Sequence, residues 1–183
     1  LICGRVAVLA PTLSKDNIRY YLSKNPNYVF GSPALLELIK RNVKDSDDLS
    51  SIHTFVSGGD FLSPMQNVDG VEFFRKHGAN TVICNGSGNA ETVGTNTMAV
   101  GSLNRPETVG RVLVGTKAII VDPDTLKELK YGEEGMLCIA GKHIFKEYYK
   151  NEEMTKKSKF MYKGTKYYKT GNMGILDEDG YFT

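Results

Sequence analysis

The stretch IHTFVSGGDFLSPMQNVDGVEFFRKHGANTVIC, residues 52–84, decides the fold class of this chain. Its two apolar runs, Ile52 to Val56 and Thr81 to Cys84, have the length of buried strands. Between them, Ser63-Pro64 is typical of a helix start, with an N-cap serine and proline at the first helical position. The residues predicted to face inward from this helix are Val68, Val71 and Phe74. The stretch therefore predicts a strand–helix–strand unit.

The same alternation is found upstream. Arg5 to Ala10 is an apolar run that predicts a strand, and Ser14 is a candidate N-cap for a following helix. Tyr28 to Phe30 predicts another strand, and Ser32-Pro33 predicts the next helix start. Repeated strand–helix–strand units indicate a parallel sheet covered by helices.

The pattern changes after about residue 105. Val112 to Val121 and Met136 to Ala140 are β-rich, with a turn predicted at Asp122-Pro123-Asp124. No helical pattern of the parallel-sheet kind follows, which favours a small antiparallel subdomain. The predicted fold class is α/β, with a parallel sheet covered by helices followed by a small antiparallel β subdomain. The predicted domains are residues 1–105 for the helix-covered parallel sheet and 106–183 for the β-rich part.

Composition excludes several classes of protein. The 183 residues are 40% hydrophobic and 24% charged, as in an ordinary globular protein, and the net charge of +2 predicts neither nucleic-acid nor membrane binding. No apolar run approaches the roughly 18 residues that span a bilayer. Cys3, Cys84 and Cys138 are widely spaced and odd in number, which favours free thiols in a reducing compartment such as the cytoplasm.

Positive charge is concentrated between Lys142 and Lys169, where nine lysines face three glutamates for a local net charge of +6. A solvated surface is the ordinary explanation of such a charge run. The other is a docking surface for an acidic partner such as a phosphorylated thiol carrier.

Two glycine-rich segments follow predicted strands, at the sheet edge where ligands of parallel sheets bind. The first is Ser57-Gly58-Gly59-Asp60, where glycine permits positive φ and close approach to a flat ligand; the alternative is a plain tight turn. The second runs from Asn85 to Thr92. Its Gly86-x-Gly88 spacing lacks the third glycine of a dinucleotide fingerprint, which excludes that motif.

The last residues include an aromatic–basic–Thr–Gly segment, Tyr168-Lys169-Thr170-Gly171-Asn172, which predicts a compact turn and is followed by a predicted Asp179-Gly180 hairpin turn. This segment resembles the Tyr-Lys/Arg-Thr-Gly-Asp motif of the adenylate-forming (AMP-binding) enzymes, which include acyl-CoA synthetases and peptide-synthetase adenylation domains. Asn85 to Glu91 resembles the family's Asn-x-Tyr-Gly-x-Thr-Glu loop. Residues 132–141 resemble its Gly-Glu-x-Gly-Glu-Leu-x-Ile-x-Gly block, and residues 148–155 resemble its Gly-Tyr-x-Asn-x-x-x-Thr stretch, with Tyr148 at the position of the glycine. These matches occur in the family's order over nearly the whole chain.

The resemblance implies that residues 1–105 bind the nucleotide and the acyl group, and it implies a role for some of the matched residues. Glu91 would be the catalytic residue that coordinates Mg²⁺; without the resemblance, an exposed loop carboxylate would be the favoured interpretation of this residue. The acid pocket would lie beside Gly86 and the helix after Pro33. The residues implied in nucleotide binding are Gly58, Gly59, Asp60, Asn85, Gly86, Ser87, Gly88, Asn89, Ala90 and Asn172. We expect Gly59, Glu91 and Asn172 to converge on one mononucleotide.

Three of the residues implied in nucleotide binding depart from the family pattern, and Met136 replaces the second Glu of the 132–141 block. Ser87 replaces an aromatic that covers adenine, at a cost of about 1 kcal/mol. Ala90 replaces a threonine and removes a phosphate hydrogen bond worth about 1–2 kcal/mol. Asn172 replaces the ribose-binding aspartate, and because its amide nitrogen can only donate, about 1.5–3 kcal/mol of nucleotide affinity is expected to be lost.

The resemblance implies an ATP-dependent carboxylate-activating ligase that uses ATP, Mg²⁺ and CoA as acceptor thiol, acting on a small carboxylic acid. The family's phosphate loop would precede residue 1 and its lysine-bearing lid would follow residue 183, so we expect an internal fragment that is inactive alone. One alternative is a peptide-synthetase-type adenylation domain that uses an acyl-carrier thiol. Another is a non-catalytic nucleotide-binding homologue.

Overall fold

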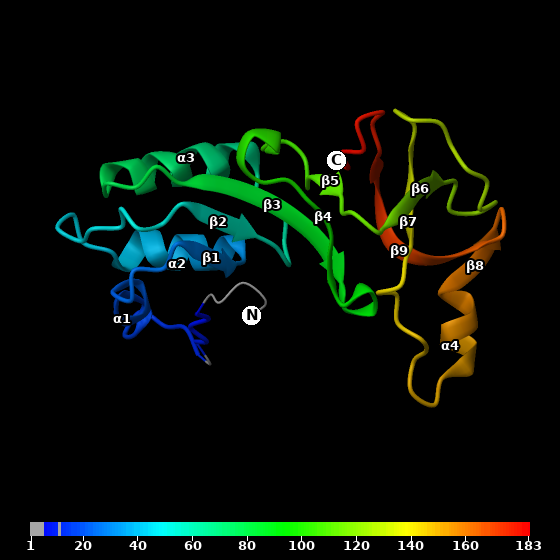
Figure 1. Cartoon of the computed structure of the whole chain (residues 1–183), viewed down its shortest axis with the longest axis horizontal. Coiled ribbons are helices and arrows are strands. Elements are labelled where there is room, and N and C mark those ends of the chain that lie inside the picture. Colours follow the sequence, from blue (N-terminus) through cyan, green and yellow to red (C-terminus); the bar gives the residue numbers. More distant parts are fainter. Residues whose placement is uncertain (1–5, 11) are drawn as a thin grey trace. The chain divides into compact units, whose positions relative to one another are not determined.

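The computed structural model describes residues 6–10 and 12–183 and divides the chain into two compact units, 1–83 and 84–183 (Figure 1). The helices of the described residues are α1 (Ile18–Leu22), α2 (Pro33–Asn42), α3 (Pro64–Lys76) and α4 (Glu152–Lys157), with short 3-10 turns η1 (Ala90–Thr92) and η2 (Gly101–Leu103). The strands are β1 (Tyr28–Gly31), β2 (Thr54–Ser57), β3 (Val82–Asn89), β4 (Gly94–Met98), β5 (Arg111–Val112), β6 (Lys117–Val121), β7 (Glu134–Ala140), β8 (Lys159–Tyr162) and β9 (Thr165–Ile175).

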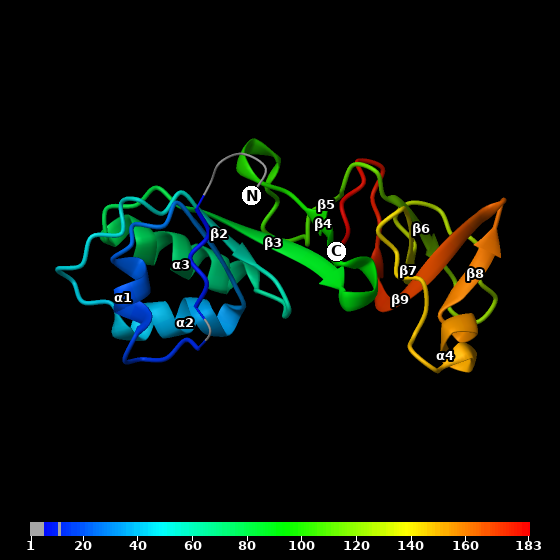
Figure 2. The same ribbon diagram turned by 60° about the horizontal axis from the view of Figure 1, so that its bottom comes forward.

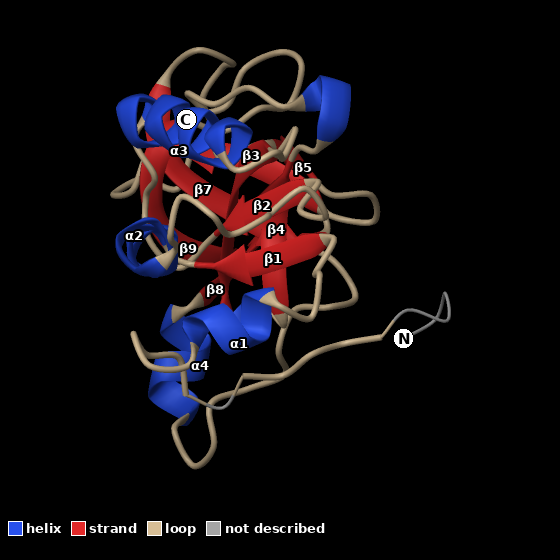
Figure 3. Cartoon of the chain, turned by 90° about the vertical axis from the view of Figure 1, so that its left-hand side faces the viewer, coloured by secondary structure: helices blue, strands red, loops and turns tan. Residues whose placement is uncertain are grey.

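The first unit has the predicted α/β character. Strands β1 and β2 pair in parallel, with Phe30 opposite Val56, and helices α1 to α3 lie beside them (Figure 3). Helix α3 begins with the predicted Ser63 cap, which forms a full capping box with Gln66. The fully buried residues that join helices to strands here are Leu36, Ile39, Phe55 and Phe74. The parallel sheet with covering helices is confirmed.

Two details of the sequence prediction for this unit are wrong. Residues 6–10 form no strand, and the side chains of Val6 and Leu9 are exposed; Arg5 lies outside the described residues. Val68 points away from the core of the unit and is 64% exposed. Helix α3 instead buries Asn67, Gly70 and Phe74, because Gly70 admits Ile83 and Leu36 where a Cβ would lie 2.6 Å from Ile83.

Strand β3 extends through residues that were predicted to form a loop. Asn85 to Asn89 continue the strand and pair antiparallel with β4, with Gly86 opposite Met98. A Cβ at Gly88 would lie 1.9 Å from the carbonyl oxygen of Gly94, so glycine permits the two backbones to approach. The glycines of this segment therefore serve strand pairing, which a local reading of the sequence does not reveal.

The second unit contains an antiparallel sheet in the order β6-β7-β9-β8 (Figure 2). Strand β7 lies inside this sheet and alternates between two cores. One face carries Leu137 and Ile139, and the other carries Met136, Cys138 and Ala140. Burial on both faces explains why this strand is an uninterrupted apolar run. The predicted antiparallel subdomain is confirmed.

Strand β9 contains the segment that was predicted to be a compact turn. It pairs with β7 through Lys169 opposite Cys138 and Met173 opposite Met136, so β9 has two extra residues at this point. The extra residues form a bulge around Gly171, which has a φ of +77°. The downstream turn is as predicted: Gly180 has a φ of +83°, and Leu176 pairs with Phe182.

Candidate functional site

Glu91 lies in the short turn η1, directly after β3. Its carboxylate oxygen Oε1 accepts a 2.7 Å hydrogen bond from the Tyr148 hydroxyl. Its backbone carbonyl accepts a second 2.7 Å hydrogen bond from the Phe145 amide. Both partners lie more than fifty residues further along the chain, so tertiary structure fixes Glu91 through its side chain and its main chain.

The charge state of Glu91 follows from these contacts. The hydrogen bond from Tyr148 holds the pKa of the Glu91 carboxyl below its usual value, and a hydrogen bond from Tyr168 acts in the same direction. The same bond to Glu91 raises the pKa of Tyr148. Burial, followed by the nearby Glu91 charge, raises the pKa of Tyr168 as well. At neutral pH the Glu91 carboxylate is therefore anionic and accepts a hydrogen bond from the neutral Tyr148 phenol, with the neutral Tyr168 phenol nearby.

Aromatic packing orients the two phenols. The Phe145 ring centroid lies 4.7 Å from that of Tyr148 and 5.6 Å from that of Tyr168, the second in edge-to-face geometry. The Lys159 ammonium lies 3.9 Å from the centroid of the Phe145 ring and donates a 2.6 Å hydrogen bond to the Phe145 carbonyl oxygen. These residues were not predicted as site residues, and no local signal in the sequence pairs them with Glu91.

The segment from Asn85 to Ala90 leads into η1. The Asn85 side chain is buried and donates a 3.2 Å hydrogen bond to the Pro106 carbonyl. The Asn89 backbone accepts a 2.8 Å hydrogen bond from the Thr92 hydroxyl, which fixes the turn beside Glu91. Ala90 is exposed, whereas Ser87 is half-buried. The structure thus places these residues along one strand and the turn that follows it.

Asn172 lies on the bulge of β9. The backbone amide of Asn172 donates a 3.0 Å hydrogen bond to the Thr170 hydroxyl, and the residue is half-buried. Asn172 lies on the same strand as Tyr168, four residues further along, at most about 13 Å of extended chain. Glu91 and Asn172 therefore belong to the same compact unit, and Tyr168, whose pKa the Glu91 charge raises, lies on the same strand as Asn172.

The remaining predicted site residues lie in the first unit, at the carboxyl end of β2. The Gly58 amide donates a 2.9 Å hydrogen bond to the Gly31 carbonyl. Gly59 has a positive φ of +83°, as predicted from the sequence. The Asp60 carboxylate accepts a 2.8 Å hydrogen bond from the Phe61 amide. The convergence of Gly59 with Glu91 and Asn172 stays a prediction.

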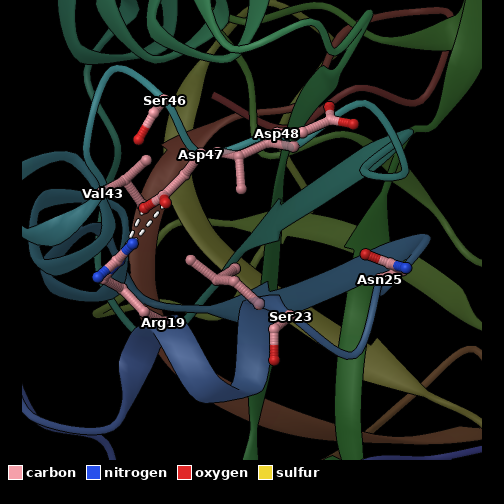
Figure 4. Close-up of a pocket in the computed structure, with 9 residues that line it drawn as sticks. Arg19, Ser23, Asn25, Val43, Ser46, Asp47 and Asp48 are labelled. Carbon is pink, nitrogen blue, oxygen red and sulfur yellow. Dashed lines mark hydrogen bonds and ion pairs between the residues drawn. The ribbon is translucent and has the colours of Figure 1, made fainter.

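A pocket of about 320 Å³ in the first unit contains none of the predicted site residues (Figure 4). It is lined by the Arg19–Asp47 ion pair, in which Arg19 Nε donates a 2.7 Å hydrogen bond to Asp47 Oδ2. The pair joins α1 to the loop after α2, and it has a structural role.

The Glu91 carboxylate could supply one ligand to a magnesium ion whose other ligands come from a nucleotide and water. Among the described residues, no group of three or more His, Cys, Asp or Glu side chains could hold a metal ion by itself. Mg²⁺ usually binds through one or two carboxylates together with substrate phosphates and waters. A single anchored carboxylate is compatible with that mode.

In the part of the chain that the structure describes, no helix has the length and apolarity to cross a bilayer.

The chain belongs to the AMP-binding enzyme family, whose model matches residues 1–149. A Bacillus subtilis (strain 168) protein named "Putative acyl-CoA synthetase YngI" is 35% identical over 139 residues, which is 75% of this chain and 24% of that protein. Nonribosomal peptide synthetase 7 of Aspergillus fumigatus is 40% identical over 75 residues, 39% of this chain and 3% of that protein.

Solved structures have the same fold. The anthranilate CoA ligase AuaEII, solved in complex with anthranoyl-AMP, superimposes with a TM-score of 0.83 at 22% identity. The alignment covers 98% of this chain and 33% of AuaEII. The chain thus spans about a quarter of the acyl-CoA synthetase and a third of AuaEII.

Proposed function

We propose that this chain is part of an ATP-dependent acid–thiol ligase. A carboxylate oxygen of the acid would attack the α-phosphorus of ATP, the bond from that phosphorus to the departing pyrophosphate oxygen would break, and acyl-AMP would form. A thiol such as CoA would then attack the acyl carbon and release AMP. Membership of the AMP-binding family supports the proposal, and the observation that carries it is the anchored Glu91 carboxylate at the end of β3.

The residues of this chain would bind and orient the nucleotide. Gly58 to Asp60 and Asn85 to Ala90 would contact adenine and the α-phosphate, and Asn172 would bind the ribose with one acceptor and one donor. Glu91 would hold Mg²⁺, which neutralises the charge that develops on the phosphate oxygens. We retain residues 1–105 as the nucleotide- and acyl-binding part and 106–183 as the β-rich part. A reducing compartment such as the cytoplasm is part of the proposal, on the odd number and wide spacing of the three cysteines.

The test is pyrophosphate exchange by the full-length protein with a panel of carboxylic acids. We expect exchange that depends on one class of acid and is lost in Glu91→Gln. Glu107→Gln, which changes an exposed glutamate, is the matched control and keeps wild-type exchange. Undiminished exchange in Glu91→Gln would contradict the proposal that Glu91 holds Mg²⁺.

Two alternatives are distinguished by related experiments. The match to a peptide synthetase favours a carrier-protein thiol in place of CoA, and loading of a carrier domain by the activated acid would support that version. The substitutions at Ser87, Ala90 and Asn172 favour a non-catalytic homologue. Nucleotide binding without exchange for any acid would establish that alternative.

A further inference from the structure

We propose that Tyr148 is a positioning residue that holds the Glu91 carboxylate toward the metal and nucleotide, and that Thr155 in turn holds Tyr148. The inference rests on the proposed function, because it assumes that Glu91 binds the metal. It adds a segment of the chain, residues 145–155, to a site otherwise formed by β3, η1 and β9.

The first step is the contact itself. Tyr148 and Phe145 provide the hydrogen bonds at 2.7 Å to the side chain and to the main chain of Glu91. Glu91 lies in η1, and the two donors lie in the segment between β7 and α4, outside any helix or strand. Secondary structure therefore does not require either bond. A carboxylate has about four acceptor positions, and the phenol contacts leave capacity for a cation. The 145–155 segment therefore restricts Glu91 without saturating it.

The second step is how Tyr148 is itself held. Its amide donates a 2.9 Å hydrogen bond to the Thr155 hydroxyl, which donates a 2.8 Å hydrogen bond to the Asn151 carbonyl. The Asn151 side chain caps α4 by accepting a 3.0 Å hydrogen bond from Met154. The first turn of α4 thus fixes the backbone of Tyr148, and packing against Phe145 restricts its ring.

The third step is why the hydroxyl is needed. A phenylalanine would preserve the ring packing with Phe145, so packing alone does not explain a tyrosine. Glu91 is only half-buried, so water can replace the Tyr148 hydroxyl as a donor to its carboxylate, and the net contribution of this bond to folding is modest. A second residue that orients a metal ligand, however, typically changes metal affinity by 10-fold or more. The bond is therefore better explained by orientation of Glu91 than by stability.

The experiment compares Tyr148→Phe with Tyr149→Phe in the full-length protein. Tyr149 is the neighbouring tyrosine and is 85% exposed, which makes it the matched control. ATP binding is measured by titration calorimetry over a range of Mg²⁺ concentrations and again in EDTA. We expect Tyr148→Phe to raise the Mg²⁺ concentration at half-maximal ATP binding by about 10-fold. ATP affinity in EDTA stays unchanged, and Tyr149→Phe matches the wild type.

A second pair of variants keeps the inference testable if Tyr148→Phe unfolds, which thermal denaturation reports. Thr155→Val removes the hydroxyl that holds Tyr148, and Thr155→Ser keeps it. We expect the valine variant to shift the Mg²⁺ dependence in the same direction as Tyr148→Phe, and the serine variant to behave as the wild type.

The outcomes separate this inference from the proposed function. If Glu91→Gln alters the Mg²⁺ dependence but Tyr148→Phe behaves like Tyr149→Phe, the positioning role is wrong and the function stands. Equal weakening of ATP binding with and without Mg²⁺ would assign Tyr148 a purely structural role and overturn the inference. If Glu91→Gln leaves the Mg²⁺ dependence unchanged, the metal role in the proposed function fails.

Discussion

The hydroxyl of Thr170 donates a 2.7 Å hydrogen bond to the carbonyl oxygen of Leu137, across the bulge between β9 and β7. The same hydroxyl accepts a 3.0 Å hydrogen bond from the Asn172 amide. One buried side chain therefore satisfies a backbone acceptor and a backbone donor that the bulge separates from the regular ladder. The bond from the Asn172 backbone amide to Thr170 fixes the position of the Asn172 backbone on the bulge.

Replacing Thr170 with valine keeps the shape of the side chain but removes both hydrogen bonds. We expect the free energy of unfolding to fall by about 1–3 kcal/mol, because the buried Leu137 carbonyl and the half-buried Asn172 backbone amide lose their partner. Urea unfolding monitored by circular dichroism measures the change. Thr95→Val, at an exposed position of β4, is the control and should have little effect. Equal stability of the two variants would contradict the structural role of Thr170.

Asn172→Asp is expected to tighten ATP binding in the full-length protein. A carboxylate can accept hydrogen bonds from both ribose hydroxyls, whereas the asparagine side chain has one acceptor oxygen. The expected gain is about 1.5–3 kcal/mol, measured by isothermal titration. Equal affinities for both forms would refute the assignment of Asn172 to the ribose.

Gly88→Ala is expected to disrupt the pairing of β3 with β4. The new Cβ would lie 1.9 Å from the Gly94 carbonyl oxygen, and the neighbour is backbone, which cannot rotate away. We expect a loss of about 1–3 kcal/mol in the free energy of unfolding. Gly86→Ala is the graded comparison, because its Cβ would lie 3.3 Å from the Thr97 carbonyl oxygen. A larger effect at Gly86 than at Gly88 would show that the register is different.

The Arg19–Asp47 pair should make thermal stability depend on pH. Hydrogen bonds, first from Arg19 and then from the Lys44 amide, lower the pKa of Asp47 from 3.8 to about 2. The folded form therefore gains stability from the carboxylate above about pH 4, the ordinary range of an unfolded aspartate, and loses it as the pH falls through about 2.

Melting temperatures of the wild type and Asp47→Asn across this range measure the effect. The difference between them should be largest near neutral pH and should shrink as the pH approaches 2. Asp45→Asn, at a neighbouring exposed aspartate, controls for the general loss of charge. A difference that stays constant from pH 6 to about 2 would contradict the ion pair.

The Cys138 thiol should be unreactive in the folded protein. It is fully buried in β7, and burial raises its pKa to about 12, so little thiolate forms at pH 8. In a Cys3→Ser, Cys84→Ser background, alkylation by iodoacetamide at pH 8 is expected only after unfolding in urea. Rapid alkylation of the native form would show that β7 is not covered on both faces.

Local sequence patterns predicted most of the secondary structure. Ser63-Pro64 and Ser32-Pro33 begin helices α3 and α2 as expected, because proline acts within one turn of the chain, and the Ser63 side chain adds a cap hydrogen bond that Ser32 lacks. The prediction was wrong where contacts with distant residues decide. Val68 is exposed because Gly70 sets the inward face of α3, and residues 85–89 form a strand because β4 pairs with them.

For the site, the order of motifs along the chain was sufficient to predict the AMP-binding family, and the family model confirms it. Motif chemistry depends on residue type and spacing, and both are present in the sequence itself. The support of Glu91 is different. Tyr148 and Tyr168 meet it only through folding of the second unit, and hydrogen bonds between residues so far apart leave no periodicity that sequence reasoning could use.

The sequence by itself thus determined the order of the elements, the family and the positions that depart from its motifs. The tertiary structure decided which side chains surround Glu91, and it decided that Asn172 lies on a bulged strand rather than in a turn. The physical reason is the range of the interactions: caps, turns and apolar periodicity act over a few residues, whereas strand pairing and buried hydrogen bonds join distant ones.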